Sequence, residues 1–248
     1  MYISYGKLSS QYYTNSKPIS KSIMGDIEYY ISRLQGTRGL VLEAGVGTGR
    51  VLIPLLENKI EIEGIDSSKD MLEICEKELE IRGLNTNLYN KDLLDLDFMD
   101  KYETIIMPTG SFMLIKDYEK LLNNFYKALK EDGRLIIDIS PPADFIEGEI
   151  YTDILEINNN EGIVLETRNI SINYINQYTK SILKYEKYIN GKLKETELQE
   201  FILYYYGVRE FSLILEKIGF KDIVISSDYL YNSKPDKNTQ IITFEAKK

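Results

Sequence analysis

The feature that most constrains the fold is an apolar strand followed directly by a glycine-rich turn and a helix. The strand is predicted over residues 39–44 and the helix over residues 49–58, with glycine at every second position between them: Gly45, Gly47 and Gly49. Glycine permits a sharp turn and lets a ligand approach the backbone closely, while a helix start offers free N–H groups to an anion. The segment therefore predicts a ligand-binding turn.

Strand and helix patterns alternate through the first 140 residues. A Ser-x-x-acid capping signal at Ser67–Asp70 and the helix stop at Gly83 delimit one of the helices. Strands that alternate with helices form mostly parallel sheets covered on both faces. Besides the segments above, helices are expected at residues 20–34, 67–82 and 118–130, and strands at residues 61–66, 87–90, 104–107 and 134–139.

From about residue 150 the pattern changes to β-branched and aromatic stretches separated by turn signals. These signals lie at residues 158–162, 176–177 and 190–191. The last, Asn190-Gly191, is typical of a type I′ hairpin turn, which needs positive φ at both central residues. We expect an antiparallel β-meander here, followed by a helix at residues 209–218 and two strands at residues 222–226 and 240–246.

Histidine is absent from all 248 residues, and this limits the chemistry. Histidine is the side chain that most often transfers protons near neutral pH, and it is a common zinc ligand. Any reaction must therefore use carboxylates, tyrosines, lysines or a cofactor, and no metal site is expected. The single cysteine, Cys75, rules out a disulfide within the chain and is expected to be a buried structural thiol.

The chain is acidic, with 39 acidic and 30 basic side chains and a formal net charge of −9. Nucleic acids and anionic lipid surfaces are bound through clustered Lys and Arg, so this balance disfavours both as partners. No apolar run reaches the roughly 20 residues that span a membrane, and the first residues carry no signal-peptide pattern. We expect a cytoplasmic protein without a membrane segment.

Acidic residues follow the ends of the two strands after the glycine turn. Asp66 ends the first of them, and Asp92 comes just after the second. In an open α/β sheet, a carboxylate at the position of Asp66 binds the two hydroxyls of a nucleoside ribose. Asp66 could instead be a helix N-terminal charge and Asp92 a solvated loop acid, but the nearby glycine turn favours the ribose role for Asp66.

Two common nucleotide-binding motifs are not matched. A G-x-G-x-x-G fingerprint that starts at Gly45 would need glycine at position 50, where Arg50 stands. No G-x-x-x-x-G-K-S/T run occurs either, so a P-loop is unsupported.

Taken in order, these motifs resemble those of class I S-adenosylmethionine-dependent methyltransferases over residues 39–140. The matching segments are Glu43-x-Gly45-x-Gly47-x-Gly49, Gly64–Ser68 with Met71 and Leu72, Asp92-Leu93, and residues 102–106 with Gly110–Phe112. The resemblance implies a Rossmann-like α/β fold: a seven-stranded, mostly parallel sheet with helices on both faces, whose last strand inserts antiparallel. It also implies a core of residues 1–148 and 207–248, an inserted antiparallel meander at residues 149–206, and S-adenosylmethionine as cofactor with S-adenosylhomocysteine as product.

The resemblance also implies roles for single residues. Glu43 and the three glycines would line the methionine moiety, Asp66 would bind the ribose, and Asp92 with the Leu93 backbone would hold the adenine. The other expected cofactor contacts are Tyr12, Ser67, Met71 and Pro108.

Tyr12 is expected near the cofactor because residues 5–13 are similar to the Y-D-x-x-A-x-x-Y-D segment of many small-molecule methyltransferases. In that segment tyrosines cover the cofactor. Both of its aspartates are replaced here, by Gly6 and Tyr13, and a packing role for Tyr12 remains open.

Methyl transfer from a sulfonium needs little acid–base help when the acceptor is a free amine or thiolate, because the leaving group is neutral. Alignment of the reactants can recover roughly 7–11 kcal/mol of the barrier. We expect a small-molecule acceptor, with an amine preferred over a hydroxyl because no strong base is visible. Candidate catalytic groups are Tyr12, Thr109, Ser111 and Asp138.

The inserted meander is expected to form a lid over the active site or a surface for homodimerisation. Two other functions stay open from the sequence. One is an NAD(P)-dependent oxidoreductase on a related nucleotide-binding fold, which Arg50 disfavours, and the other is a non-catalytic cofactor-binding protein.

Overall fold

The computed structural model describes Tyr2 and residues 5–248. The chain forms two compact units. The larger unit comprises Ile19–Pro141 and Tyr205–Lys248, and the smaller comprises the described residues up to Pro18 together with Pro142–Tyr204. The division of the chain into a core of residues 1–148 and 207–248 and an insertion of residues 149–206 stays a prediction.

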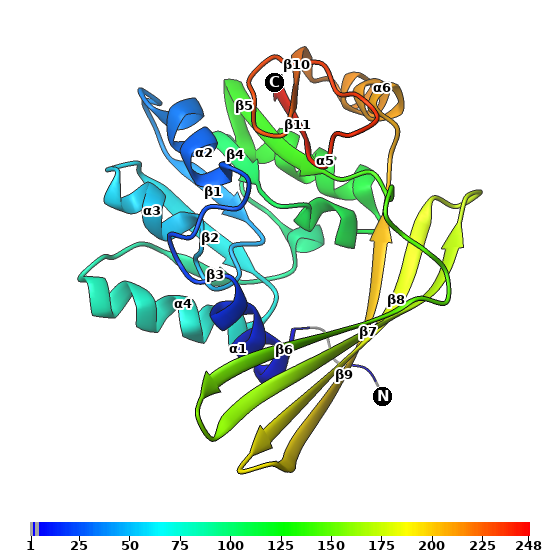
Figure 1. Ribbon diagram of the computed structural model, residues 1–248. Coiled ribbons are helices and arrows are strands. Elements are labelled where there is room, and N and C mark those ends of the chain that lie inside the picture. The colour runs from blue at the N-terminus through cyan, green and yellow to red at the C-terminus, as the bar shows by residue number, and fades with distance from the viewer. Residues whose placement is uncertain (1, 3–4) are drawn as a thin grey trace. The chain divides into compact units, whose positions relative to one another are not determined.

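The larger unit is built on a seven-stranded sheet with the order β10-β11-β5-β4-β1-β2-β3 (Figure 1). Strand β11 is antiparallel to both of its neighbours, whereas β1 to β5 pair in parallel. This confirms the Rossmann-like, mostly parallel sheet with its antiparallel last strand. The strands are β1 (Val41–Ala44), β2 (Ile62–Asp66), β3 (Leu88–Asn90), β4 (Tyr102–Met107), β5 (Leu129–Ile139), β10 (Lys221–Ser227) and β11 (Ile242–Lys247).

Helices cover both faces of this sheet because successive strand residues point to opposite sides. On one face, Val41 of β1 and Ile62 of β2 share an apolar cluster with α2, α3 and α4. On the other face, Phe211 of α6 packs edge-on against Phe244 of β11, with ring centroids 4.8 Å apart. The helices are α2 (Asp26–Leu34), α3 (Leu52–Glu57), α4 (Lys69–Arg82), α5 (Tyr118–Ala128) and α6 (Val208–Ile218), with short 3₁₀ turns η1 (Leu93–Asp95) and η2 (Ser111–Leu114).

Three helix starts differ from the sequence expectation by more than one residue, and one of them is α3, which begins at Leu52 rather than residue 49. Helix α2 begins at Asp26 rather than near residue 20, because Ser20, Met24 and Gly25 all adopt positive φ. Helix α4 is capped by Ser68, whose Oγ accepts a hydrogen bond from the Met71 N–H at 3.2 Å. The capping serine is thus one residue later than the expected Ser67.

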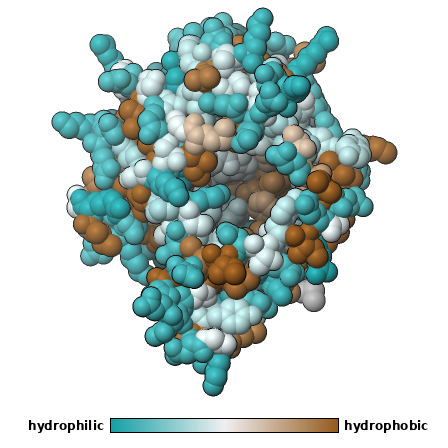
Figure 2. Space-filling model, viewed as in Figure 1, coloured by the Kyte–Doolittle hydropathy of each residue, from teal (hydrophilic) through white to brown (hydrophobic). Residues whose placement is uncertain are grey.

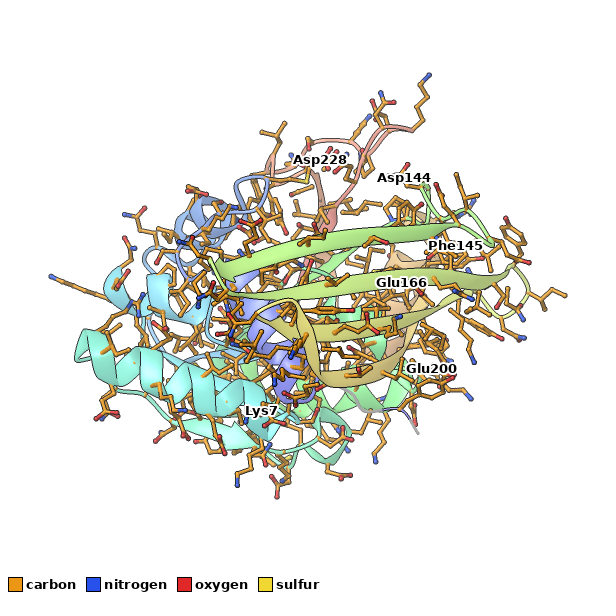
Figure 3. All side chains as sticks on the ribbon, turned by 60° about the horizontal axis from the view of Figure 1, so that its bottom comes forward. Lys7, Asp144, Phe145, Glu166, Glu200 and Asp228 are labelled. Atoms are coloured by element: carbon orange, nitrogen blue, oxygen red, sulfur yellow. The ribbon has the colours of Figure 1, made fainter. Side chains whose placement is uncertain are left out.

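The smaller unit is a four-stranded antiparallel meander with helix α1 (Lys7–Ser16) packed on one face. The three turns fall where the sequence predicts them, and Asn190 and Gly191 have φ of 51° and 71°. Figure 3 shows the face opposite α1, from which Glu166 and Glu200 project. The strands are β6 (Ile150–Asn158), β7 (Glu161–Asn173), β8 (Tyr178–Ile189) and β9 (Lys192–Tyr204).

Helix α1, which the sequence did not predict, is attached to the meander by polar contacts. The Glu197 carboxylate of β9 accepts hydrogen bonds from the N–H groups of Leu8 at 2.9 Å and Ser9 at 3.2 Å. A distant carboxylate therefore caps the helix N-terminus, where N–H groups lack helical partners. Lys187 of β8 also donates to the Gln11 side chain at 3.1 Å.

Neither a membrane-spanning helix nor a metal-binding cluster occurs in the described part of the chain. None of its helices combines the length and apolarity that crossing a membrane requires. No three Cys, Asp or Glu side chains gather into a potential metal site within it. On the face seen in Figure 2, hydrophilic residues predominate and apolar side chains stand in small groups.

Glu63 of β2 is the centre of a buried cluster of polar side chains. It accepts hydrogen bonds from Lys101 Nζ at 2.7 Å and from the Tyr102 hydroxyl at 2.9 Å. The Lys101 ammonium also lies over the Phe98 ring, 4.4 Å from its centroid. Burial alone would raise the pKa of Glu63, but its bonds to Lys101, Asn87 and Tyr102 lower the pKa below its ordinary value.

Glu63→Gln is expected to lower the free energy of unfolding by about 1–3 kcal/mol at pH 7, because it removes a charged hydrogen-bond acceptor. A carboxylate with a lowered folded-state pKa stabilises the fold above its unfolded pKa, and that stabilisation is lost as pH falls. The difference from wild type should therefore shrink below pH 4.5 in urea unfolding. As a control, Asp97→Asn breaks the exposed pair with Lys91 and should leave stability nearly unchanged.

Candidate active site

The functional residues expected from the sequence in the larger unit lie mostly at one edge of its sheet. Strands β1 to β5 are parallel, so their carboxyl ends share that edge. Glu43 lies in β1, Asp66 ends β2, Pro108 follows β4 and Asp138 lies near the end of β5. This is the edge at which open α/β sheets bind ligands.

The glycine turn between β1 and α3 is hydrogen-bonded to β2, and the space beside the Gly47 Cα is empty. Gly45, Gly47 and Gly49 have backbone φ angles of 75°, 53° and 83°. Residues other than glycine rarely adopt this region. The Gly45 N–H donates to the Ile65 carbonyl at 2.8 Å. A Cβ atom added to Gly47 would meet nothing within 4 Å, so the backbone here is accessible to a ligand.

The other two glycines are required by packing. A Cβ atom on Gly49 would lie 2.7 Å from Cys75 Sγ, closer than real Cβ contacts allow. A Cβ atom on Gly45 would lie 3.2 Å from the Ser111 Cβ, which places the loop after β4 against the glycine turn.

The Asp66 carboxylate holds the glycine turn and the start of α4 together. Its Oδ2 accepts a hydrogen bond from the Gly47 N–H, and its Oδ1 accepts one from the Ser68 N–H, both at 2.8 Å. Burial raises the pKa of Asp66, against the opposing effect of these N–H groups. Each carboxylate oxygen can accept a further hydrogen bond, so the group suits a ligand with two adjacent hydroxyls.

Glu43 has a buried carboxylate with an unsatisfied oxygen. The residue is 3% exposed, and its Oε2 has no hydrogen-bond partner among the described residues. Burial raises the pKa of Glu43 well above its ordinary value, although the positive charge of Arg50 opposes the shift. An unpaired buried carboxylate oxygen is costly, so the site fits a ligand that supplies an ammonium group there, as the methionine end of S-adenosylmethionine does.

Arg50 and Asp26 form a buried ion pair that the sequence did not predict. Their side chains are 3% and 0% exposed, and Arg50 also donates to the Lys21 carbonyl at 3.2 Å. Asp26 accepts further hydrogen bonds from the N–H groups of Ile23 and Ile27, both at 2.8 Å. From the sequence, Arg50 is only a departure from the dinucleotide fingerprint, because no local pattern links it to a residue 24 positions earlier. The pair joins the glycine turn to the start of α2.

The loop after β4 has an unusual backbone. Thr109 and Gly110 both have positive φ, 52° and 76°. The Pro108 carbonyl accepts a hydrogen bond from Ser111 Oγ at 3.2 Å. The Thr109 N–H donates to Asp138 Oδ2 at 2.8 Å. The loop is thus fixed at both ends of its turn.

Asp138 is fully buried, and both of its oxygens accept hydrogen bonds. In addition to Thr109, the Tyr229 hydroxyl donates to Oδ2 at 2.9 Å and the Thr243 hydroxyl donates to Oδ1 at 2.7 Å. Burial raises the pKa of Asp138 to about 6, while these bonds act in the opposite direction.

Asp138 is expected to make the protein less stable as pH rises from about 4 to about 6. Its folded-state pKa of about 6 lies above the ordinary value of 3.8, so the folded state binds the proton more tightly. Its stabilising contribution is therefore complete at low pH and is lost as pH rises through 6. A shift of this size corresponds to at most about 3 kcal/mol.

Urea unfolding of wild type and Asp138→Asn between pH 4 and pH 7 isolates this contribution, because the other carboxylates are common to both. The stability of wild type relative to the variant should fall across this range. A difference that stays constant with pH would contradict the prediction.

Asp92 and Leu93, which are expected to hold the adenine, follow β3, while Ser67 and Met71, two other expected cofactor contacts, follow β2. Asp92 is exposed, and its Oδ1 accepts a hydrogen bond from the Leu94 N–H at 2.8 Å. Leu93 is buried, Ser67 is exposed, and Met71 is buried in the first turn of α4. Their roles in binding the cofactor stay predictions.

Tyr12 lies in the smaller unit. Its hydroxyl donates to the Asp153 carboxylate of β6, and its ring packs edge-on against Tyr185 with centroids 5.6 Å apart. Tyr12 therefore packs within the smaller unit, which is the alternative role that the sequence left open for it. A contact of Tyr12 with the cofactor stays a prediction.

Comparisons with known proteins agree with this geometry. A family model described as a methyltransferase domain matches residues 41–133, which contain the glycine turn, Asp66 and Asp92. The chain is 21% identical over 212 residues to a protein of Geobacillus sp. (strain WCH70) named as a methyltransferase, with 84% of each chain covered.

The fold is also shared with solved structures. An S-adenosylmethionine-dependent methyltransferase from Clostridium acetobutylicum has a TM-score of 0.76 at 18% identity, with 96% of each chain covered. A sugar N-methyltransferase from Streptoalloteichus sp. has a TM-score of 0.75 at 17% identity, with 98% of this chain and 94% of that chain covered.

The domain match covers the glycine turn, Asp66 and Asp92, and the fold is shared with the structural neighbours. These findings support the methyltransferase interpretation rather than the oxidoreductase alternative or a non-catalytic protein. Residues 41–133 therefore match a methyltransferase domain, and the chain shares its fold with S-adenosylmethionine-dependent methyltransferases, which supports an enzyme that uses S-adenosylmethionine as its cofactor.

Proposed function

We propose that the enzyme methylates an amine of a small molecule. The observation that carries this proposal is the state of Asp138, the one carboxylate that the sequence offered as a proton acceptor. It is fully buried and accepts hydrogen bonds from Thr109, Tyr229 and Thr243. A hydroxyl acceptor needs a base to remove its proton, whereas a neutral amine already carries the attacking lone pair.

Two further observations support a small amine as acceptor. The net charge of −9 disfavours a nucleic-acid substrate. One protein that shares the fold, from Streptoalloteichus sp., is a sugar N-methyltransferase. The fold is therefore compatible with transfer to nitrogen.

For the cofactor we propose the following arrangement. Glu43 binds the ammonium of the methionine moiety through its unpaired oxygen, and Asp66 binds the ribose hydroxyls. Asp92 and the Leu93 N–H bind the adenine, while Ser67, Met71 and Pro108 line the same site. Bound S-adenosylmethionine supplies an electrophilic methyl group on a sulfonium, and these residues hold it in place for in-line attack.

The meander with α1 is proposed as a lid for the acceptor or as a homodimer surface. Strand β6 lies at an open edge of its sheet, and Ile150 and Ile154 on it are 49% and 67% exposed. Exposed apolar edge strands tend to be covered by another chain. Sedimentation of wild type and Ile154→Lys distinguishes the two, because a dimer through β6 should dissociate in the variant while a lid should leave the mass unchanged.

Transfer of labelled methyl from S-adenosylmethionine tests the acceptor proposal. Matched pairs of amino and hydroxy compounds, such as an amino sugar and its parent sugar, are offered to the enzyme. Label is expected on the amine of a pair, with one S-adenosylhomocysteine formed per methyl transferred. Label only on hydroxyl compounds would overturn the amine assignment.

A further inference from the structure

We propose that Asp138 is a positioning residue: it holds Thr109 in a left-handed backbone conformation and thereby fixes the loop after β4 against the glycine turn. The proposal concerns cofactor binding and does not depend on which acceptor the enzyme uses.

Thr109 has a backbone conformation that its side chain disfavours. Its φ is 52°, and a β-branched residue in this region is crowded between its Cβ and the backbone. Such strain persists only when surrounding contacts impose it, and it concentrates at functional sites. Gly110, with φ of 76°, adopts the same region without this crowding.

The contact that imposes this conformation is the hydrogen bond from the Thr109 N–H to Asp138 at 2.8 Å. Asp138 cannot easily move away, because Thr243 of β11 and Tyr229 in the loop after β10 bond it from other directions. Tyr229 in turn packs against Tyr29 of α2, with ring centroids 5.5 Å apart. The anchor for the loop is therefore built from several elements of the larger unit.

The loop after β4 also contacts the glycine turn, so the position of Thr109 affects the turn. Ser111 follows two residues after Thr109, and its Oγ donates to the Pro108 carbonyl at 3.2 Å. The Cβ of Ser111 lies 3.2 Å from the position that a Cβ on Gly45 would occupy, so the two segments are in close contact. A shift of Thr109 would therefore move Ser111 against the turn that receives the cofactor.

Asp138→Asn tests the proposal, since it preserves the size of the side chain but removes the negative charge that strengthens the bond from the Thr109 N–H and replaces one of the two acceptor oxygens with an NH2 group. We expect S-adenosylhomocysteine to bind about tenfold more weakly in calorimetry, and the amides of residues 108–113 to exchange hydrogen faster. Thr243→Val is the matched control: it removes another bond to Asp138 but leaves the Thr109 bond in place. It should lower the melting temperature and weaken binding less than Asp138→Asn does, because Tyr229 still bonds Asp138.

Rescue separates positioning from a merely structural role. Glycine adopts positive φ without strain, so Thr109→Gly added to Asp138→Asn is expected to recover most of the lost affinity. If the double variant binds no more tightly than Asp138→Asn, or if Thr243→Val weakens binding equally, the proposal is overturned.

Wild-type protein supplies a second measurement that does not depend on the folding of any variant. The Thr109 amide is expected to exchange at least a hundredfold more slowly than an unprotected amide, with or without S-adenosylhomocysteine. Exchange at the unprotected rate would show that the bond to Asp138 does not hold the loop, and would overturn the proposal.

Discussion

Asp66→Ala is expected to weaken the binding of S-adenosylhomocysteine at least a hundredfold. The variant loses the carboxylate proposed to accept two ribose hydroxyls, and hydrogen bonds to a charged group contribute about 1.5–3 kcal/mol each. It also frees the N–H groups of Gly47 and Ser68, which Asp66 now holds at 2.8 Å. Isothermal titration calorimetry measures the change directly.

Two further variants define the cause. Asp66→Asn keeps one acceptor oxygen, so its affinity should fall between those of wild type and Asp66→Ala. Asp97→Ala removes an exposed acid outside the site and should bind as wild type does. An Asp66→Ala protein that is folded by circular dichroism and binds with wild-type affinity would disprove the ribose assignment.

Gly49→Ala is expected to destabilise the fold by about 3 kcal/mol or more. The new methyl would lie 2.7 Å from the buried Cys75 Sγ and 3.1 Å from Ile53, on a backbone with φ of 83°. Overpacking and left-handed strain each cost about 1–3 kcal/mol. Adding Cys75→Ala should recover part of the loss, because it removes the sulfur that the methyl meets.

Gly47→Ala, the matched variant, should lose mainly cofactor affinity rather than stability. Its φ of 53° carries a strain of about 1–2 kcal/mol, but a Cβ at this position meets nothing within 4 Å. The variant should remain folded and bind S-adenosylhomocysteine more weakly, because the methyl occupies the space over the turn. Equal losses of stability in the two alanine variants, measured by urea unfolding, would contradict this division of roles.

The parts of the fold that the sequence predicts are those encoded locally. The alternation of strands and helices, the stop at Gly83 and the hairpin turn at Asn190-Gly191 all depend on neighbouring residues, and all are confirmed. Helix α1 was missed because its segment has no clear apolar face and its N-terminus is capped by Glu197, 189 positions from Leu8. Such a contact leaves no local signal.

The candidate site likewise contains features that are encoded locally in the sequence and contacts that depend on tertiary packing. The sequence indicates that Glu43 and Asp66 share one edge, because the ends of parallel strands meet there. It does not reveal that Asp26 pairs with Arg50, nor that Asp138 bonds Tyr229 and Thr243, which lie 91 and 105 positions away. These contacts are set by tertiary packing, so the proposal that Asp138 anchors the loop after β4 rests on the three-dimensional structure and not on the sequence.

The cap on α1 has a consequence for synthesis of the chain. Leu8 and Ser9 are synthesised 189 and 188 residues before Glu197, which receives their N–H groups. Contacts of such long range form late, because the intervening chain must first be ordered. Helix α1 therefore acquires this cap only after Glu197 has been synthesised, when the residues of β1 to β5 have already been made.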